Sequence, residues 1–343
     1  MKIEEKRGFR LSEKEYKFIV NLPSSRSLRG LANKTGISVS GALEIKKRLE
    51  RRGKFHSVFN YRFFGLTPVA IIGREPVPSE FPLGTLTVRR LSGIGRYVLV
   101  TGLVPDEFVA SFVSMLDMDI AAFVKGTAFL KWLPNEACTG LSDHILEPRW
   151  EGLKEKSLFI EKLETLETRV PDIIDAIILW GKIKYGPFYS VKKIIREALK
   201  VDEYLKGLTK QAVSYHYRRH VLPGWLYNTF IPRLSMEHIP LRIYYLEGRD
   251  AYLVALTLVH LPYFYTAYID HGKVLITGQV PCWMEYELYD KVLSVMDIKL
   301  PLGGLLASAP DLMFDVPKLW RYLESRGRRW VWKWKKEKLR RGA

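Results

Sequence analysis

Apolar residues at the start of the chain recur every three to four positions, the spacing of helices that bury one face. Between residues 11 and 52 this spacing predicts three short helices. Ser12 and Glu15 stand in the positions of a capping box at the start of the first helix. Gly36 ends the second helix at a turn that needs a positive φ, and Ser38 caps the third. We call this predicted unit the first head.

After this head, apolar residues recur at every second position, as expected for strands. The aromatic run 55–64 predicts the wing of a winged helix, and further elements follow after Gly65. We expect strands at 69–73, 86–89 and 97–104, a helix at 106–116, and one or two strands over 120–132. A small α+β domain therefore follows the three-helix head.

The pattern of the first half recurs in the second. Val98–Pro105 reads VLVTGLVP and Val274–Pro281 reads VLITGQVP, and each is followed by a helical run. The offset between matching residues grows slowly along the chain, as a tandem duplication with small loop insertions would leave it. Two linked copies can form one pseudo-symmetric unit that binds two half-sites of a DNA duplex.

The second copy differs from the first in its connections. Residues 150–170 are charged and predict a connecting helix. A second head opens at Pro171, and its third helix is expected over 209–221. The second α+β unit has a helical stretch over 250–261, where the first has only residues 75–84, broken by three prolines.

The sequence therefore predicts an α+β protein with two tandem copies of a three-helix head followed by a small α+β domain. The expected boundaries are 1–65 and 66–140 for the first copy, 141–170 for a charged linker or helix, 171–235 and 236–320 for the second copy, and 321–343 for a basic Trp-rich tail.

Composition favours a polyanionic partner. The formal net charge is +17 and the pI is about 9.7, which points to nucleic acid first and to an anionic membrane second; a basic surface kept for solubility is the alternative. Cys138 and Cys282 fall in different halves, so no disulfide framework is expected. The N-terminus lacks an apolar signal core and no stretch reaches 18 uncharged apolar residues, so we expect a cytoplasmic protein. Few Gln and Asn residues are typical of hyperthermophiles.

The third helix of each head carries the candidate DNA contacts, because in a helix-turn-helix this helix lies in the major groove. The candidates in the first head are Arg29, Ser38, Ser40, Lys46, Lys47, Arg48, Arg51 and Arg52. Those in the second head are Thr209, Lys210, Gln211, Ser214, Tyr215, His216, Arg218 and Arg219. The alternative is an amphipathic helix whose basic face is only solvated.

The first copy resembles the Lrp/AsnC family of feast/famine transcription regulators, in an archaeal-type tandem version. The resemblance rests on Gly36-Ile37-Ser38-x-Ser40, Lys47-Arg48-Leu49-Glu50-x-Arg52-Gly53, Phe64-Gly65-Leu66, and Leu91-Ser92-Gly93-Ile94-Gly95-Arg96-Tyr97. It covers roughly residues 11–132 and recurs more loosely over 171–307. The resemblance implies that each copy is a winged helix-turn-helix, which binds double-stranded DNA, followed by a βαββαβ (ferredoxin-like, RAM-type) sensing domain. It implies a role in transcription.

The resemblance also implies an effector site. The third helix of the first head departs from the family pattern. Family members often bind amino acids at a loop that corresponds here to Ser92, Gly93, Gly95 and Arg96, although glycines also make ordinary hairpin turns. Gly41, Leu43 and Glu44 stand where a DNA reader offers hydroxyl or basic groups, and Glu44 would repel phosphate. We therefore expect the second head to read most of the sequence and the first to position the backbone.

The tail from Arg321 onward holds ten Lys or Arg residues against two Glu. Trp330, Trp332 and Trp334 alternate with basic or apolar residues, which predicts a strand with the rings on one face. Three interpretations stay open: a docked structural strand, a nucleic-acid contact or a membrane-interface contact. The candidate nucleic-acid contacts in the tail are Arg328, Arg329, Lys333 and Lys335.

No other motif indicates catalysis, and no cofactor is expected. His216 and His220 have the spacing of a metal pair, but we expect no carboxylate or Cys nearby to complete a site. We expect a DNA-binding regulator, not an enzyme, acting as a monomeric pseudo-dimer or a higher homo-oligomer. Two rivals remain: an enzyme that resembles siroheme decarboxylases, with His271 as a candidate acid, and a non-specific architectural DNA- or RNA-binding protein.

Overall fold

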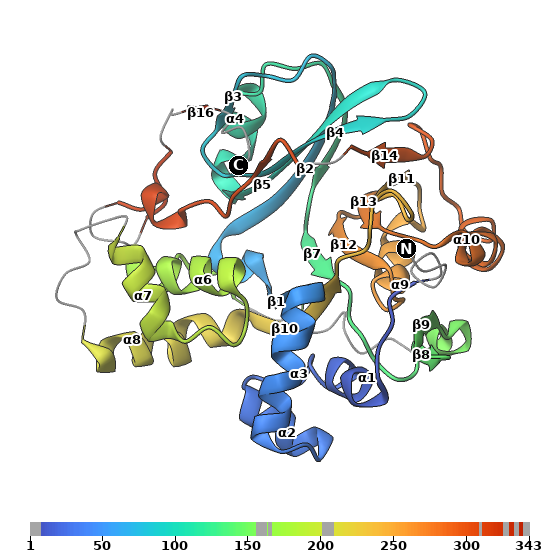
Figure 1. The fold of residues 1–343 in the computed structure, drawn as a ribbon. Helices are drawn as coiled ribbons and strands as arrows, with labels where there is room; N and C mark the ends of the chain where they lie inside the picture. The colour runs from blue at the N-terminus through green and yellow to red at the C-terminus, as the bar shows by residue number, and fades with distance from the viewer. Residues whose placement is uncertain are drawn as a thin grey trace.

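The computed structural model describes residues 8–155, 163, 167–200, 209–308, 311–324, 329–332 and 336–338, which form a mixed α+β structure with a large antiparallel sheet (Figure 1). The first head consists of α1 (Glu13–Val20), α2 (Leu28–Thr35) and α3 (Val39–Arg52). The local predictions are confirmed: Ser12 and Glu15 form a reciprocal capping box, Gly36 has φ 68°, and Ser38 caps α3.

The second head consists of α6 (Ile173–Tyr185), α7 (Val191–Leu199) and α8 (Lys210–His216). A π-helical turn, η6 (Tyr217–Val221), continues α8, and the 3-10 turn η7 (Leu222–Gly224) follows it. Asp172 caps α6 and Thr209 caps α8 through side-chain oxygens. The helix predicted over 209–221 is thus confirmed, with a wider last turn.

The two heads meet through a pair of strands. β1 (Gly53–Phe59) runs antiparallel to β10 (Trp225–Pro232), with Ser57 opposite Asn228. The predicted strand over 55–64 ends earlier, because Tyr61–Phe64 forms a 3-10 turn. The described strand therefore finds its partner in the other half of the chain and does not fold back as a wing hairpin.

The large sheet combines both halves. The first half contributes β2 (Leu66–Arg74), β4 (Thr85–Ser92), β5 (Arg96–Pro105) and β6 (Ile120–Lys125), in the order β6-β2-β5-β4. The second contributes β11 (Arg242–Glu247), β12 (Phe264–Ile269), β13 (Lys273–Gly278) and β14 (Leu305–Ala307), in the order β14-β11-β13-β12. Each half thus places its fourth strand beside its first, then its third, then its second.

The halves are joined reciprocally at both sheet edges. β14 of the second half pairs with β4 of the first, where Leu306 lies opposite Ser92. β7 (Ala128–Lys131), which continues the line of β6, pairs with β12 of the second half. In each contact the last strand of one half meets the second strand of the other, as in an isologous dimer interface.

Both faces of this sheet are buried. In the first half, Val69, Ile71 and Val100 pack outward under Phe112 of α4 (Val109–Ser114), which follows η3 (Asp106–Phe108). The alternate residues, including Ala70 and Ile72, belong to a second core that also holds Ile243, Tyr245 and Leu275. In the second half, α9 (Ala251–Leu258) and α10 (Cys282–Leu288), extended by the π turn η8 (Tyr289–Leu293), cover the outer face.

The C-terminal tail covers the place where the first half lacks its helix. Residues 75–84 contain only the short strand β3 (Glu80–Pro82), which pairs with β16 (Lys336–Lys338). Trp330 is buried, and the Trp332 ring stacks on Tyr322 with centroids 5.7 Å apart. These two rings therefore pack against the protein itself, together with β15 (Met313–Phe314) and η9 (Leu319–Tyr322) nearby in the chain. Arg328, Lys333, Trp334 and Lys335 lie outside the described residues.

The segment predicted as a charged linker begins as a hairpin. β8 (Thr139–Ser142) and β9 (Ile145–Pro148) pair across a tight turn at Asp143 and His144, and η4 (Trp150–Glu155) follows. The Tyr16 hydroxyl of α1 donates to the Thr139 carbonyl at 2.6 Å, so the hairpin supports the first head. Most of the expected connecting helix after Glu155 lies outside the described residues. Among the described helices, none is both long and apolar enough to cross a membrane.

Candidate nucleic-acid interface

The third helix of the first head presents a mixed surface. Ala42, Ile45 and Leu49 are buried against α1 and α2, which turns the opposite face of α3 outward. That outward face carries Ser38, Val39, Ser40, Leu43, Glu44, Lys47 and Arg51. The predicted hydroxyl groups are therefore accessible, but an acidic and two apolar side chains lie among them.

Part of the basic charge predicted for the first head is neutralised internally. Glu15 is buried, and its Oε1 lies 3.2 Å from Arg48 Nε while its Oε2 lies 3.8 Å from Arg52 Nη1. Lys46 pairs with Glu50. Within the described part of the chain neither Lys47 nor Arg51 pairs with a carboxylate, and Arg29 is exposed on α2.

The third helix of the second head presents a polar and cationic surface. Val213 is buried, and the exposed side chains are Thr209, Lys210, Gln211, Tyr215, Arg218 and Arg219. Thr209 Oγ1 accepts the Ala212 backbone N–H at 3.1 Å, so its side chain serves as the helix cap. Ser214 is half-buried, and His216 turns toward α6. Among the described residues, no carboxylate pairs with Lys210, Arg218 or Arg219.

A basic face on α7 extends this surface and was not predicted. Ile194, Ile195 and Ala198 are buried, which turns Lys192, Lys193 and Arg196 into solvent. The spacing of these cations opposite the apolar residues is a signal that the sequence already contained. In helix-turn-helix proteins the helix before the recognition helix lies near the DNA backbone, so its cations suit phosphate contacts.

The histidines of the second head lie in a cluster that sequence reasoning missed. His216 Nδ1 lies 2.9 Å from Asp175 Oδ1 and 3.2 Å from Asp172 Oδ2, and His220 Nδ1 lies 3.2 Å from Asp175 Oδ1. Burial and the neighbouring Asp172 raise the pKa of the Asp175 carboxyl. The prediction that no carboxylate lies near these histidines was wrong, because both aspartates approach from α6, some forty residues earlier in the sequence.

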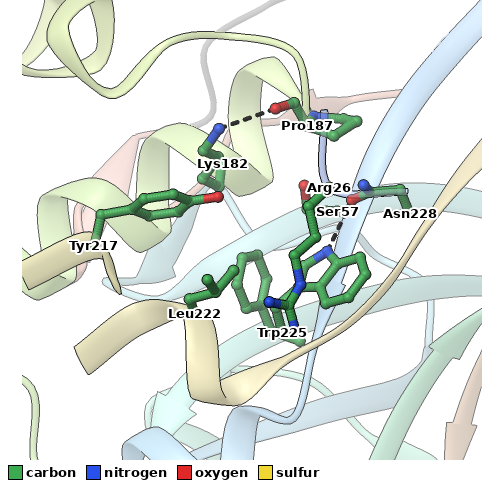
Figure 2. Close-up of a pocket in the computed structure, with 9 residues that line it drawn as sticks. Arg26, Ser57, Lys182, Pro187, Tyr217, Leu222, Trp225 and Asn228 are labelled. Carbon is green, nitrogen blue, oxygen red and sulfur yellow. Dashed lines mark hydrogen bonds between the residues drawn. The ribbon is translucent and has the colours of Figure 1, made fainter. Parts of the chain in front are cut away.

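A small cavity marks the junction of the two heads. Figure 2 shows Arg26 of the first head and Lys182 of the second on its walls, together with Trp225 of β10. Its volume is ≈ 10 Å³, enough for about one water molecule. The buried Lys182 Nζ donates to the carbonyls of Pro187 at 2.9 Å and Tyr189 at 2.8 Å, and burial lowers the pKa of its ammonium to about 8. The cavity is therefore part of the packing between the heads.

A larger open cavity lies between the strand pair and the sheet. It has a volume of ≈ 640 Å³ and its lining includes Lys54, His56, Arg89 and Arg233. Burial lowers the pKa of Lys54 and of His56, and burial together with the charge of Lys54 lowers the pKa of Lys131 to about 7. The lining also contains the acid Glu237, and Arg89 pairs with Asp311, so the basic groups of this cavity are in part neutral or already paired.

The predicted effector loop lies elsewhere. Ser92, Gly93 and Arg96 are exposed at the turn between β4 and β5, and Gly95 is half-buried. Gly93 abuts β14, because a Cβ atom there would lie 2.7 Å from Leu305 Cδ2. The loop therefore sits at an edge where the halves join, and it lines none of the cavities discussed above. His271, the candidate acid, is exposed between β12 and β13, with its ring stacked on Tyr252.

Comparison with protein-family models, with curated proteins and with solved structures finds no match to this chain. The Lrp/AsnC resemblance therefore continues to rest on the motifs in the sequence.

Proposed function

We propose that the protein is a sequence-specific, double-stranded-DNA-binding transcription regulator that acts as an intramolecular pseudo-dimer. The observation that carries the proposal is the exposed polar face of the capped third helix, with Gln211 on α8 and Arg218 and Arg219 on its π-helical continuation η6. Gln suits adenine and Arg suits guanine or phosphate, so this face has the chemistry of a groove reader.

The arrangement of the halves supports a duplicated ancestor for this regulator. Each half has a three-helix head, a strand that pairs with its counterpart, and four sheet strands in the same order. We assign these to two winged-helix-type heads and two ferredoxin-like sensing domains. Figure 1 shows both heads on the same side of the large sheet, flanking β1 and β10, which suits a pair of half-sites.

The test is the selection of genomic DNA fragments by the purified full-length protein at two salt concentrations. We expect enrichment of a defined motif, and an affinity whose logarithm falls with log[salt] by about 0.9 for each phosphate contact. Equal binding of all fragments would leave only a non-specific architectural role. Binding that does not depend on salt would remove the cationic faces from the interface.

A second candidate, an enzyme similar to siroheme decarboxylases, is favoured by the cavity of ≈ 640 Å³ lined by Lys54, His56 and Arg89. Within this lining, Lys54 and Arg233 are the groups that suit the carboxylates of a tetrapyrrole, since Arg89 already pairs with Asp311. Titration with a carboxylated tetrapyrrole, followed by its absorption band, separates the candidates. A saturable spectral change that Arg233→Ala removes would favour the enzyme, and an unchanged band would exclude it.

A further inference from the structure

Four side chains of the second head converge on one point. The nitrogens His216 Nδ1 and His220 Nδ1 lie 3.2 Å apart, and Asp175 Oδ1 lies 2.9 Å from the first and 3.2 Å from the second. Asp172 Oδ2 lies 3.2 Å from His216 Nδ1, and all four donor atoms fall within 4.8 Å of one another. Ligands about 2.1 Å from a tetrahedral Zn²⁺ are separated by roughly 3.4 Å, which is close to most of these distances.

The capping box of α6 fixes the direction of both carboxylates. Asp172 Oδ1 accepts the Asp175 N–H at 2.9 Å, and Asp175 Oδ2 accepts the Asp172 N–H at 3.3 Å and lies 3.4 Å from Arg169. Each aspartate therefore has one oxygen engaged and directs the other toward the histidines. Hydrogen bonds that hold a carboxylate in this way are typical of metal ligands.

Proton sharing alone fits this geometry poorly. The three atoms His216 Nδ1, His220 Nδ1 and Asp175 Oδ1 form a nearly equilateral triangle. Two N–H groups donating to one carboxylate oxygen prefer diverging lone-pair directions, which keeps the donors further apart. The Asp175 side chain is only 1% exposed, so water does not relieve the crowding.

The first head shows which positive charges the corresponding acid of the second head lacks. There the equivalent acid of the capping box, Glu15, faces Arg48 and Arg52, which are also four residues apart on the third helix. Two guanidinium groups carry permanent positive charge. In the second head two imidazoles, which carry charge only when protonated, face the acid instead, and a second carboxylate, Asp172, stands where the first head has Ser12; among the described residues Arg169 is the one permanent cation paired with Asp175.

We propose that Asp172, Asp175, His216 and His220 bind one divalent transition-metal ion, represented by Zn²⁺. Imidazole nitrogen together with carboxylate oxygen suits zinc and its neighbours, whereas Ca²⁺ and Mg²⁺ prefer oxygen alone. Four protein ligands make a closed, structural site. The ion clamps the end of α8 and the π turn η6 to the start of α6, and so fixes the orientation of the third helix.

The test measures metal directly on the full-length protein, without DNA, so its outcome stands apart from the proposed function. Chelator-treated protein is titrated with Zn²⁺, and with Co²⁺ as a spectroscopic probe of the coordination. We expect one equivalent of Zn²⁺ retained after gel filtration, a rise in Tm, and the visible absorption of tetrahedral Co²⁺. The double variant His216→Ala/His220→Ala should lose all three, while His271→Ala, an exposed histidine outside the cluster, should keep them.

A second variant distinguishes loss of the metal site from loss of the fold. Asp172→Asn keeps an N-cap side chain for α6 but places an amide in the cluster. We expect it to keep the helical circular dichroism of the wild type and to bind Zn²⁺ at least tenfold more weakly. Wild-type protein that retains no Zn²⁺, or a double variant that retains as much as the wild type, overturns the proposal and leaves a proton-held cluster.

Discussion

The two heads place an acid at the same position and use it differently. Glu15 and Asp175 are each the fourth residue of a capping box on the first helix, and each faces a pair of residues four apart on the third. In the first head that pair is Arg48 and Arg52, so basic residues that could contact DNA are held by the protein. In the second head the pair is His216 and His220. Arg218 and Arg219, which lie between them in the sequence, are exposed.

The comparison teaches that the number of basic residues in a recognition helix does not measure its capacity for phosphate. The helix α3 is rich in Lys and Arg, yet Lys46, Arg48 and Arg52 have internal partners. The helix α8 has fewer cations, and its neighbour α7 adds an exposed basic face. In the proposed DNA complex we therefore expect the number of unpaired, exposed cations, which packing sets, to decide which head contributes more.

The largest expected effect is on DNA affinity. Arg218→Ala/Arg219→Ala should weaken binding by about tenfold to hundredfold and lower the salt slope by about 2, because two phosphate contacts are lost. Lys47→Ala/Arg51→Ala in the first head should cost less than about tenfold on the same scale. Fluorescence anisotropy across salt concentrations measures both, with Arg249→Ala, on a distant exposed turn, as control. Equal losses in the two double variants would contradict unequal heads.

The next effect is on stability. Glu15→Ala removes a helix-cap contact and the partner of Arg48 and Arg52, so we expect the free energy of unfolding to fall by about 2 kcal/mol. Urea denaturation measures it, and Glu13→Ala, an exposed acid of the same helix turn, should change it by less than about 0.5 kcal/mol. A loss no larger than that of the control would show that the ion pairs of the first head do not hold its third helix.

Local features could be predicted from the sequence, and contacts between distant segments could not. The capping box at Ser12 and the turn at Gly36 depend on neighbours within four residues, so the pattern alone identified them. The alternation over 55–64 predicted a strand, but its partner β10 lies in the other half, and nothing local identifies it. For the same reason nothing in the sequence identified β3 as the partner of β16 at Lys336–Lys338, which lies beyond the strand predicted at Trp330, Trp332 and Trp334.

In the candidate site, too, local features were predicted and contacts between distant segments were not. The exposed face of α8 was predicted, since it needs only the helical period of one segment. Asp172 and Asp175 were missed because α6 and α8 meet only after the head folds. The two heads share only the four-residue step within each pair, because Arg48 follows Glu15 by 33 residues and His216 follows Asp175 by 41.

A smaller effect concerns the packing between the heads. Lys182 is protonated in both the folded and the unfolded chain below about pH 8, so its burial penalty is then complete. Between about pH 8 and its unfolded pKa of about 10.4, the folded chain loses the proton first, and stability should rise. We expect the free energy of unfolding to rise by about 1–2 kcal/mol between pH 7 and pH 9.5 because of this residue. Urea denaturation of Lys182→Met at both pH values should lack the rise, whereas the surface variant Lys192→Met should keep it. An identical slope in Lys182→Met would show that Lys182 titrates normally.

The smallest effect tests why the first head is the weaker one. Glu44 is exposed on the outward face of α3, on the same side as Ser40 and Lys47. If that face lies near phosphate, Glu44→Gln removes a repulsion, and affinity for DNA should rise about twofold to fivefold at low salt. The gain should vanish at high salt, because exposed charges are then screened. Anisotropy titrations at two salt concentrations measure it, with Glu13→Gln, on the first helix of the same head, as the matched control. An unchanged affinity at low salt would place α3 away from the duplex and leave the second head as the DNA-binding unit.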